Sequence, residues 1–349
     1  MPSSIAAGFL AFEVLAVMSK PKVGVVLFQL GGPDSSQAVE PFLYNLFCDP
    51  DIINFPGAFL ARKPLARYIS SRRAQVVREH YDAIGGRSPI RMLTERQARR
   101  LEAALAPDFD VRCWVAMRYW HPMTAAAVAG VRAESLDALV LLPLYPHYSF
   151  ATTLSSLKEW KRLYRPASGA PKETIVEGFH THPLYVQALA ERIATSLTHF
   201  DDPASVHLVF SAHGLPLSLI ERGDPYQRQI EETVREVLAL GGWPNPHVLA
   251  YQSRVGRQKW LEPSLTHTID RLAREGKKQL LVIPISFVTE HIETLHEINI
   301  EARQEALALG VEQFEMMPAL GDSPRFIGAL ADLVRVALNG GAAETKHRR

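Results

Sequence analysis

Cysteine is scarce in this chain of 349 residues, which contains only Cys48 and Cys113 and has no CxxC motif. Two thiols cannot form a four-cysteine zinc site, hold an iron–sulfur cluster or build a disulfide framework. We therefore expect no iron–sulfur cluster and a reducing, cytoplasmic location. Excess charge of one sign is also lacking, because the net charge is +1. This balance argues against nucleic acid as a partner, since such contacts need a surplus of lysine and arginine.

The apolar run at the start of the chain is too short to cross a bilayer. Residues 5–17 are apolar apart from Glu13, whereas a membrane-spanning helix needs about 20 such residues. The run also lacks the basic region and the cleavage pattern of a signal peptide. Met18 stands immediately before the first organised segment, so we expect residues 1–17 to be a translated leader without a structural role. The alternative is a weak amphipathic membrane anchor.

Hydrophobic residues make up 47% of the chain, which at this length is enough for a large core and two domains. Short apolar runs of strand length alternate with amphipathic segments of helix length. The expected strands lie at 23–28, 111–117, 138–144, 174–176, 206–211, 247–251, 279–287 and 312–317. The expected helices lie at 94–105, 124–133, 184–199, 226–240, 265–275 and 324–338.

This alternation predicts βαβ units and parallel sheets. Eight strands in one open sheet are possible, but the stretch 165–172, which contains proline and glycine, falls near the middle of the series. We therefore predict an α/β fold with two doubly wound domains, each a four-stranded parallel sheet flanked by helices. The expected domains cover 18–170 and 171–323, and the helix 324–338 is expected to pack back on the first domain.

The segment from Gln279 to Arg303 joins a buried strand to an acidic helix. Drawn as an α-helix, it places four carboxylates within roughly 80° of one another, those of Glu290, Glu293, Glu297 and Glu301. Like charges at this spacing destabilise a helix slightly, so the row does not serve helix stability. A solvated helix face is the plain alternative, but the row begins where a core strand ends, which is where open α/β folds keep their sites. With His291 and His296 on the same helix, the row looks like a path for a cation.

Polar and aromatic residues follow the other strands. His213 comes directly after the apolar run VHLVFSA, and a neutral imidazole there can accept a proton or bind a metal. A histidine that only completes the turn is the alternative. Arg118 and Arg254 suit ligand carboxylates, unless they are ordinary surface residues. The loop aromatics could line a slot for a large flat ligand or belong to the core; they are Tyr119, Trp120, Tyr145, Tyr148 and Trp260.

Seven segments together resemble the ferrochelatase family: VLFQLGGPDS, YDAIGGRSPI, VAMRYWHP, LLPLYPHYSFATTLSS, VFSAHGLP, YQSRVGRQKWLEPS and IPISFVTEHIETLHEINIEAR. The resemblance runs from about Lys20 to Asp332, and SAHGLP together with EHIETLHE is highly specific. Members of this family insert ferrous iron into a porphyrin in haem synthesis. The resemblance implies two Rossmann-like domains with a porphyrin cleft between them, in which His213 and Glu293 face each other across the macrocycle.

The resemblance also implies which residues form the site. His213 and Glu293 are the expected catalytic and metal-binding pair. A proton or metal path is expected through Glu290, His291, Glu297 and Glu301, although many members have aspartate in place of Glu290. The expected porphyrin-binding residues are Leu30, Arg118 and Tyr119, which match family positions, together with Tyr145, Ser149 and Trp260.

We therefore predict a lyase that inserts Fe²⁺ into protoporphyrin IX, with porphyrin and Fe²⁺ as substrates and no permanently bound cofactor. Members with a [2Fe–2S] cluster hold it with four cysteines, so this chain is expected to lack one. Coproporphyrin as the substrate, another tetrapyrrole or metal, and a non-enzymatic haem or metal carrier stay open. The stretch Phe55–Ile69 mixes apolar residues with Arg62, Lys63 and Arg67, which predicts at most a peripheral membrane contact.

Overall fold

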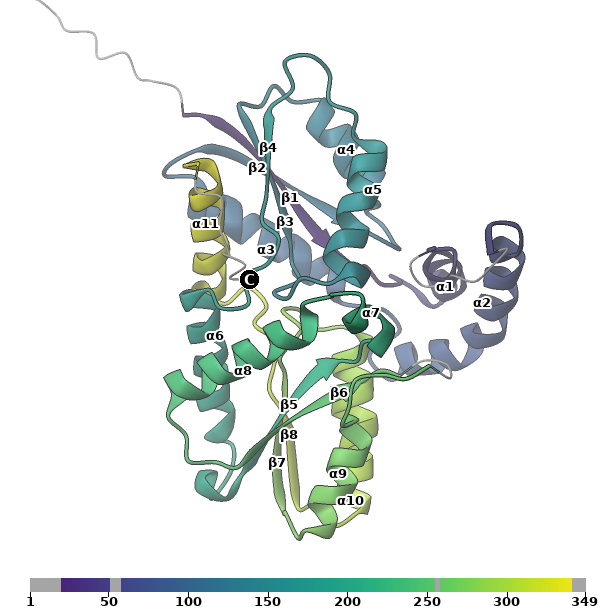
Figure 1. Ribbon diagram of the computed structural model, residues 1–349, viewed down its shortest axis with the longest axis vertical. Coiled ribbons are helices and arrows are strands. Elements are labelled where there is room, and N and C mark those ends of the chain that lie inside the picture. The colour runs from purple at the N-terminus through teal and green to yellow at the C-terminus, as the bar shows by residue number, and fades with distance from the viewer. Residues whose placement is uncertain (1–19, 51–57, 255–257, 341–349) are drawn as a thin grey trace, which may run out of the picture.

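The computed structural model describes residues 20–50, 58–254 and 258–340. These residues form two four-stranded parallel sheets (Figure 1). The first has the order β2-β1-β3-β4, with β1 (Lys22–Gln29), β2 (Asp110–Met117), β3 (Ala138–Pro143) and β4 (Lys172–Ile175). The second has the order β6-β5-β7-β8, with β5 (His207–His213), β6 (His247–Gln252), β7 (Gln279–Pro284) and β8 (Gln313–Met316). The prediction of two four-stranded parallel sheets is confirmed.

The central strands are buried along almost their whole length. In β1 every residue after Lys22 is buried, and in β7 every residue after Gln279 is buried. A parallel sheet is covered by helices on both faces, so its inner strands read as continuous apolar runs. The arrowheads of β1 and β5 both point toward the middle of the molecule (Figure 1), so the carboxyl ends of the two sheets face each other.

Strand β4 corrects the expected domain boundary. It pairs with β3 in parallel register from Ala138 opposite Lys172 to Leu141 opposite Ile175, so it belongs to the first sheet. The boundary between residues 170 and 171 was wrong, because it separates this strand from its partner. Residues 165–172 connect a helix to the last strand of the first sheet and are not an interdomain linker.

Helices cover the sheets, and the six expected ones are present. They are α3 (Ile90–Leu105), α4 (Thr124–Arg132), α6 (Pro183–Leu197), α8 (Tyr226–Gly241), α9 (Leu265–Arg274) and α11 (Pro324–Leu338). Further helices were not predicted, namely α1 (Val39–Phe47), α2 (Ala58–Asp82), α5 (Ser155–Leu163), α7 (Leu217–Glu221) and α10 (Arg303–Ala308). Helix α11 packs against α3 and β3 of the first sheet and against α6. Short 3₁₀ turns lie at Ser36–Ala38 (η1) and Pro203–Ser205 (η3).

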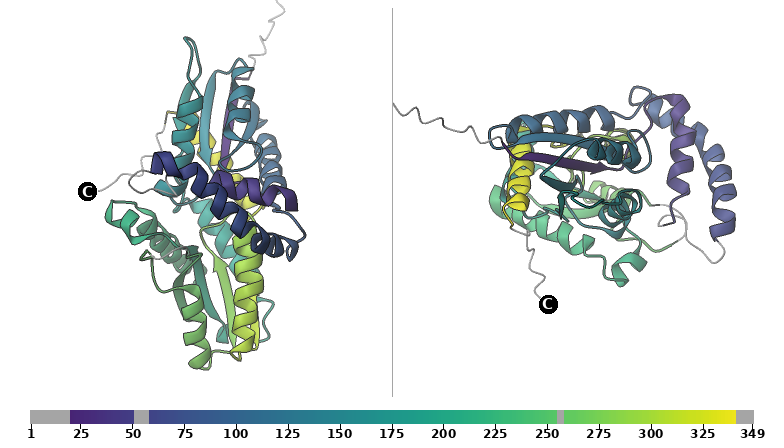
Figure 2. Two further views of the ribbon diagram at one scale, coloured as in Figure 1. Left: turned by 90° about the vertical axis from the view of Figure 1, so that its right-hand side faces the viewer. Right: turned by 90° about the horizontal axis from the view of Figure 1, so that it is seen from above.

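Helices α1 and α2 stand side by side at one flank of the molecule, apart from both sheets (Figure 2). The buried stripe of α2 includes only small residues along most of its length, Ala66, Ser70 and Ala74. Between Ala66 and Ala74 no large apolar residue is fully buried, so this part of the helix lacks the pattern that reveals a helix in sequence. Of the expected membrane-contacting stretch Phe55–Ile69, residues 55–57 lie outside the described part of the chain, as do residues 1–17.

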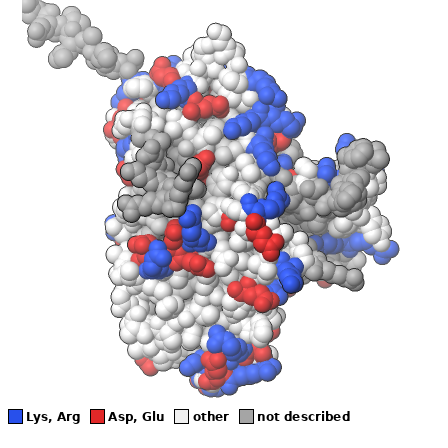
Figure 3. All heavy atoms as spheres, viewed as in Figure 1, with Lys and Arg blue, Asp and Glu red and all other residues white. Residues whose placement is uncertain are grey.

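None of the helices in the described ranges is long and apolar enough to cross a membrane. On the face shown in Figure 3, lysine and arginine side chains lie next to aspartate and glutamate side chains. This mixture accords with the net charge of +1.

Candidate active site

His213 is the last residue of β5, and its ring is fixed by the turn that follows. Its Nδ1 lies 2.6 Å from the carbonyl oxygen of Gly214. An Nδ1–H that donates to this carbonyl leaves Nε2 unprotonated and able to accept a proton. The backbone carbonyl of His213 accepts a hydrogen bond from the Tyr226 hydroxyl at 3.0 Å. A Cβ at position 214 would lie 2.7 Å from the carbonyl oxygen of Gln252, so this turn needs glycine.

Nε2 of His213 faces Glu293. The distance from His213 Nε2 to Glu293 Oε1 is 3.8 Å, and the other carboxylate oxygen lies 3.3 Å from Nε2 of His291. Burial raises the pKa of Glu293, but the charges of His213 and His291 and the hydrogen bond from His291 outweigh it and lower that pKa to about 2. Glu293 is therefore a carboxylate at neutral pH, although its side chain is only 20% exposed.

His291 contacts the Glu293 carboxylate oxygen that faces away from His213. Its Nδ1 lies 3.1 Å from the carbonyl oxygen of Thr289, and its Nε2 faces the Glu293 carboxylate. Both ring nitrogens thus face acceptors, an arrangement that suits the imidazolium, in which both nitrogens donate. Burial lowers the pKa of His291, yet the hydrogen bond and charge of Glu293 and the Thr289 carbonyl outweigh it, so the net shift is upward.

The acidic helix is a π-helix and not the α-helix that we expected. It is η4 (Glu293–Ala302), and the amide of the residue after it, Arg303, donates to the carbonyl of Ile298, five residues earlier. Helices with this wider turn are rare and occur often at functional sites. A second one, η2 (Phe150–Leu154), follows β3.

Glu290 lies before η4 and does not continue the row of carboxylates. One of its oxygens accepts a hydrogen bond from the backbone amide of Ala319 at 2.6 Å, and the other accepts one from the Thr294 hydroxyl. These bonds hold Glu290 in a structural role. The expectation that four carboxylates share one helix face was therefore wrong, because the helix begins three residues after Glu290.

Glu297 is the next member of the row. The Ser253 hydroxyl donates to its Oε2, and Gln252 Nε2 donates to the same oxygen at 3.3 Å. Burial and the nearby charge of Glu293 raise the pKa of Glu297 to about 7, although the bond from Ser253 lowers it. Glu297 can therefore gain and lose a proton near neutral pH.

Ser253 makes its bond from an unusual backbone. Its φ is +63°, and among the described residues it is the only one other than glycine with a positive φ. A residue other than glycine is uncommon in this left-handed region, and such residues cluster at functional sites.

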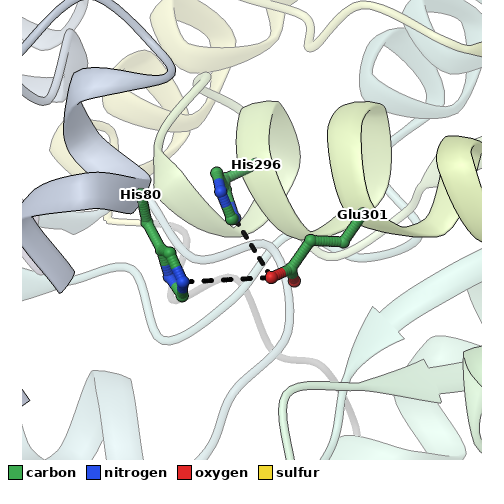
Figure 4. A group of neighbouring side chains, drawn as sticks. All are labelled: His80, His296 and Glu301. Atoms are coloured by element: carbon green, nitrogen blue, oxygen red, sulfur yellow. Dashed lines mark ion pairs between the residues drawn. The ribbon is translucent and has the colours of Figure 1, made fainter. Parts of the chain in front are cut away.

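Glu301 ends the row at the surface. Its Oε1 lies 3.5 Å from Nδ1 of His296 and 4.0 Å from Nε2 of His80 (Figure 4). His80 comes from α2, which the sequence did not predict, so its place beside the acidic helix could not be foreseen.

The six expected porphyrin-binding residues divide into two groups. The partly exposed ones are Leu30, Arg118, Tyr145 and Trp260. Tyr119 and Ser149 are 2% and 1% exposed, so neither has enough accessible surface for a large contact with a ligand. The Ser149 hydroxyl instead donates to Asp224 at 2.9 Å, which links the loop after β3 to the loop before α8.

Arg118 is already occupied by a buried carboxylate. A terminal nitrogen of Arg118 lies 2.7 Å from Oδ2 of Asp49, and its Nε donates to the Ser155 hydroxyl at 3.1 Å. The Tyr119 hydroxyl donates to the same Asp49 oxygen at 2.6 Å. A two-pronged bond from Arg118 to a ligand carboxylate would therefore have to compete with Asp49, a residue that sequence reasoning missed.

Comparison with known proteins decides the family. The family model for ferrochelatase matches residues 22–338. The chain belongs to the ferrochelatase family. A curated ferrochelatase of Geotalea uraniireducens is 51% identical over 313 residues, covering 90% of this chain and 97% of that protein. The ferrochelatase of Gloeobacter violaceus is 48% identical over 317 residues, again with 90% and 97% coverage.

Among solved structures, the chain is similar to SirB from Bacillus subtilis with Fe³⁺, with a TM-score of 0.54, 11% identity, and coverage of 91% of this chain and 96% of that one. It is also similar to CbiX, the terminal enzyme for biosynthesis of sirohaem in denitrifying bacteria, with a TM-score of 0.50, 17% identity, and coverage of 90% and 99%. At these identities the likeness concerns the fold alone, which is that of two chelatase-type domains.

In this ferrochelatase family member, the structure brings together His213, Glu293, His291 and Glu297, and it leaves Glu301 at the outer end of their row. The residues of the candidate site that the sequence analysis did not single out are Asp49, His80 and Ser253. For Ser253 a signal was present, because it directly follows the strand β6 in a loop beside the expected ligands.

Proposed function

We propose that this ferrochelatase inserts Fe²⁺ into protoporphyrin IX, and that His213 and Glu293 perform the exchange of protons for metal. The chain is an enzyme of haem biosynthesis, a lyase. The observation that carries the proposal is the pair itself: Nε2 of His213 lies 3.8 Å from the carboxylate of Glu293. Behind Glu293 the row of carboxylates leads to the surface.

His213 is the proposed proton acceptor. Metal insertion replaces two pyrrole N–H protons by one Fe²⁺, so two protons must leave the macrocycle. An imidazole with a free Nε2 at the end of a rigid strand can accept them in turn. The negative charge of Glu293 stabilises the imidazolium that forms, as a carboxylate beside a histidine does in general.

Glu297 is the proposed relay. Its pKa of about 7 lets it alternate between the two protonation states at working pH. Glu293 holds its proton far too weakly to store one, because its pKa is about 2. Glu293 therefore supplies charge, while Glu297 passes protons from the buried end of the row toward Glu301 at the surface.

Ferrous iron is the metal that we propose, and the porphyrin is proposed to bind between the carboxyl ends of the two sheets. The mixture of imidazole nitrogen and carboxylate oxygen suits Fe²⁺, whereas a soft metal would favour thiolates. Leu30, Tyr145 and Trp260 are the proposed contacts of the ring, since they are partly exposed at loops after β1, β3 and β6. The free thiols Cys48 and Cys113 fit the cytoplasmic location that we infer.

The test is an oxygen-free assay that mixes the purified protein with protoporphyrin IX and Fe²⁺ and follows the porphyrin absorption spectrum. We expect many equivalents of haem per protein, and much less from Glu293→Gln than from the control Glu312→Gln, which changes an exposed glutamate. Faster turnover of coproporphyrin would make that the substrate. Conversion that stops at one equivalent would mean a carrier, and turnover only with cobalt or nickel would mean a different chelatase.

A further inference from the structure

Three metal-binding side chains meet at the outer end of the acidic row, and the proposed reaction uses only one of them. His80 is contributed by α2, while His296 and Glu301 are contributed by η4 (Figure 4). The donor atoms of all three lie within 4.8 Å of one another. We define these residues as the outer cluster.

His296 is the most buried member of the outer cluster. It is 6% exposed, and its Nδ1 makes no hydrogen bond within the described residues. This nitrogen points at the Glu301 carboxylate from 3.5 Å, beyond good hydrogen-bond length. A buried polar atom without a hydrogen bond is costly and calls for an explanation, of which an absent ion is one.

The rings of His80 and His296 lie face to face. They stack with centroids 4.1 Å apart and planes 18° from parallel. Two imidazolium rings at this distance would repel each other strongly. Neutral imidazole is the form that binds metals.

We propose that His80, His296 and Glu301 bind a divalent first-row cation, such as Zn²⁺, that ties α2 to η4. Two imidazoles and one carboxylate are a common ligand set for such ions, with water at the remaining positions. Ligand atoms about 2.0–2.2 Å from a tetrahedral ion lie roughly 3.4 Å from one another. The 3.5 Å between His296 and Glu301 meets this distance, whereas His80, at 4.0 Å from Glu301, must move closer and rotate out of its stack with His296 so that its lone pair points at the shared ion.

The outer cluster is accessible from solvent and joins α2 to η4, two elements that make few other contacts with each other. The side chains of His80 and Glu301 are 36% and 51% exposed, so an ion can enter from solvent. Helix α2 packs mainly along α1 and η1, at the flank of the molecule. Its carboxyl-terminal end reaches η4, where the ring of His80 stacks on that of His296. A bound ion would fasten this end of α2 to the second sheet.

The experiment measures Zn²⁺ binding without porphyrin, so its outcome is separate from that of the proposed reaction. The parent protein is Glu293→Gln, which weakens metal binding at the His213 site, and it is freed of metal with a chelator. Isothermal titration with Zn²⁺ should show binding of about one equivalent. Adding His80→Ala should weaken this binding at least about tenfold, since even supporting residues of metal sites contribute that much. Adding His267→Ala, which removes an exposed histidine from α9, should change nothing.

A parent that binds no Zn²⁺ would overturn the proposal, as would equal affinity in the His80→Ala and His267→Ala proteins. His80→Gln keeps the side-chain volume and should lose the affinity like His80→Ala, which separates loss of a ligand from loss of packing. Hydrogen exchange tests the tie itself. Zn²⁺ should slow amide exchange at the carboxyl-terminal end of α2 in the parent and not in His80→Gln, and binding without any such protection would contradict the tie.

Discussion

The Ser253 hydroxyl donates a hydrogen bond to the carboxylate of Glu297 from a backbone with φ of +63°. This bond favours the charged form of a glutamate whose pKa is already raised to about 7 by burial and by Glu293. The pKa of the proposed proton relay thus lies near 7, and the hydrogen bond from the Ser253 hydroxyl limits how far that pKa is raised.

Ser253→Gly should therefore shift the pH dependence of turnover. Glycine accepts the positive φ, so the backbone stays in place while the hydroxyl is lost. Loss of the bond should raise the pKa of Glu297 further, and the limb of the pH–rate profile that reports this group should move to higher pH. The measurement is kcat against pH for both proteins, and an unshifted profile would exclude Glu297 as the relay.

Glu293→Gln and Glu297→Gln should change stability in opposite directions. The lowered pKa of Glu293 contributes stability that is present above its unfolded pKa, near 4.5, and is lost as the pH falls toward 2. The raised pKa of Glu297 means that stability is full below about 4.5 and falls as the pH rises toward 7. At pH 8 the first variant should lose, and the second should gain, about 1–3 kcal/mol in the free energy of unfolding.

The free energies of unfolding of Glu293→Gln and Glu297→Gln are measured by denaturant unfolding at pH 8 and pH 4. At pH 4 the gain from Glu297→Gln should vanish, because the wild-type group is then protonated in the folded and much of the unfolded state. Glu312→Gln, at an exposed position, is the control and should be neutral at both values. Equal effects of the two substitutions at pH 8 would contradict the assigned charges.

Tyr119→Phe should affect stability more than substrate binding. It removes the hydroxyl that donates to the buried Asp49, and an under-satisfied buried acceptor costs about 1–3 kcal/mol. The ring is 2% exposed, so the KM for porphyrin should change less than twofold. A large rise in KM with unchanged unfolding free energy would show instead that Tyr119 contacts the substrate.

Replacing both cysteines by serine should leave turnover within about twofold, because Cys48 and Cys113 are too few to hold an iron–sulfur cluster. The purified protein should also lack acid-labile sulfide. Stoichiometric sulfide, or loss of activity together with a visible chromophore, would refute the expectation.

Much of the fold could be predicted because parallel strands are buried on both faces and thus form continuous apolar runs. The runs ending near Phe28 and Ile283 are examples. The last strand of the first sheet could be found but not assigned, because the Pro/Gly stretch before Lys172 looks like a linker. Helix α2 was missed because its buried stripe, Ala66 to Ala74, is made of small residues.

The site could be predicted in part for a similar reason. His213 is the last residue of β5, and Glu293 opens the helix that follows β7, so the order of elements in the sequence places both beyond core strands. The π-helix could not be anticipated from the spacing of the glutamates. Residues four apart share a face in an α-helix and nearly share one in a π-helix, so the same pattern fits both. His80 and Asp49 reach the site from segments far away in sequence, and only tertiary packing brings them to Glu301 and Arg118.

The most direct test of the account is turnover of His213→Ala and Glu293→Gln under anaerobic conditions with saturating porphyrin. Loss of a general base typically costs ~10²–10⁴-fold, and we expect that loss in kcat for His213→Ala while porphyrin still binds. Glu293→Gln should fall by a similar factor, the double variant should be little worse than either because the two act as a unit, and His267→Ala should match wild type. Near-normal kcat in either single variant would contradict the account and move the proton–metal exchange away from His213 and Glu293.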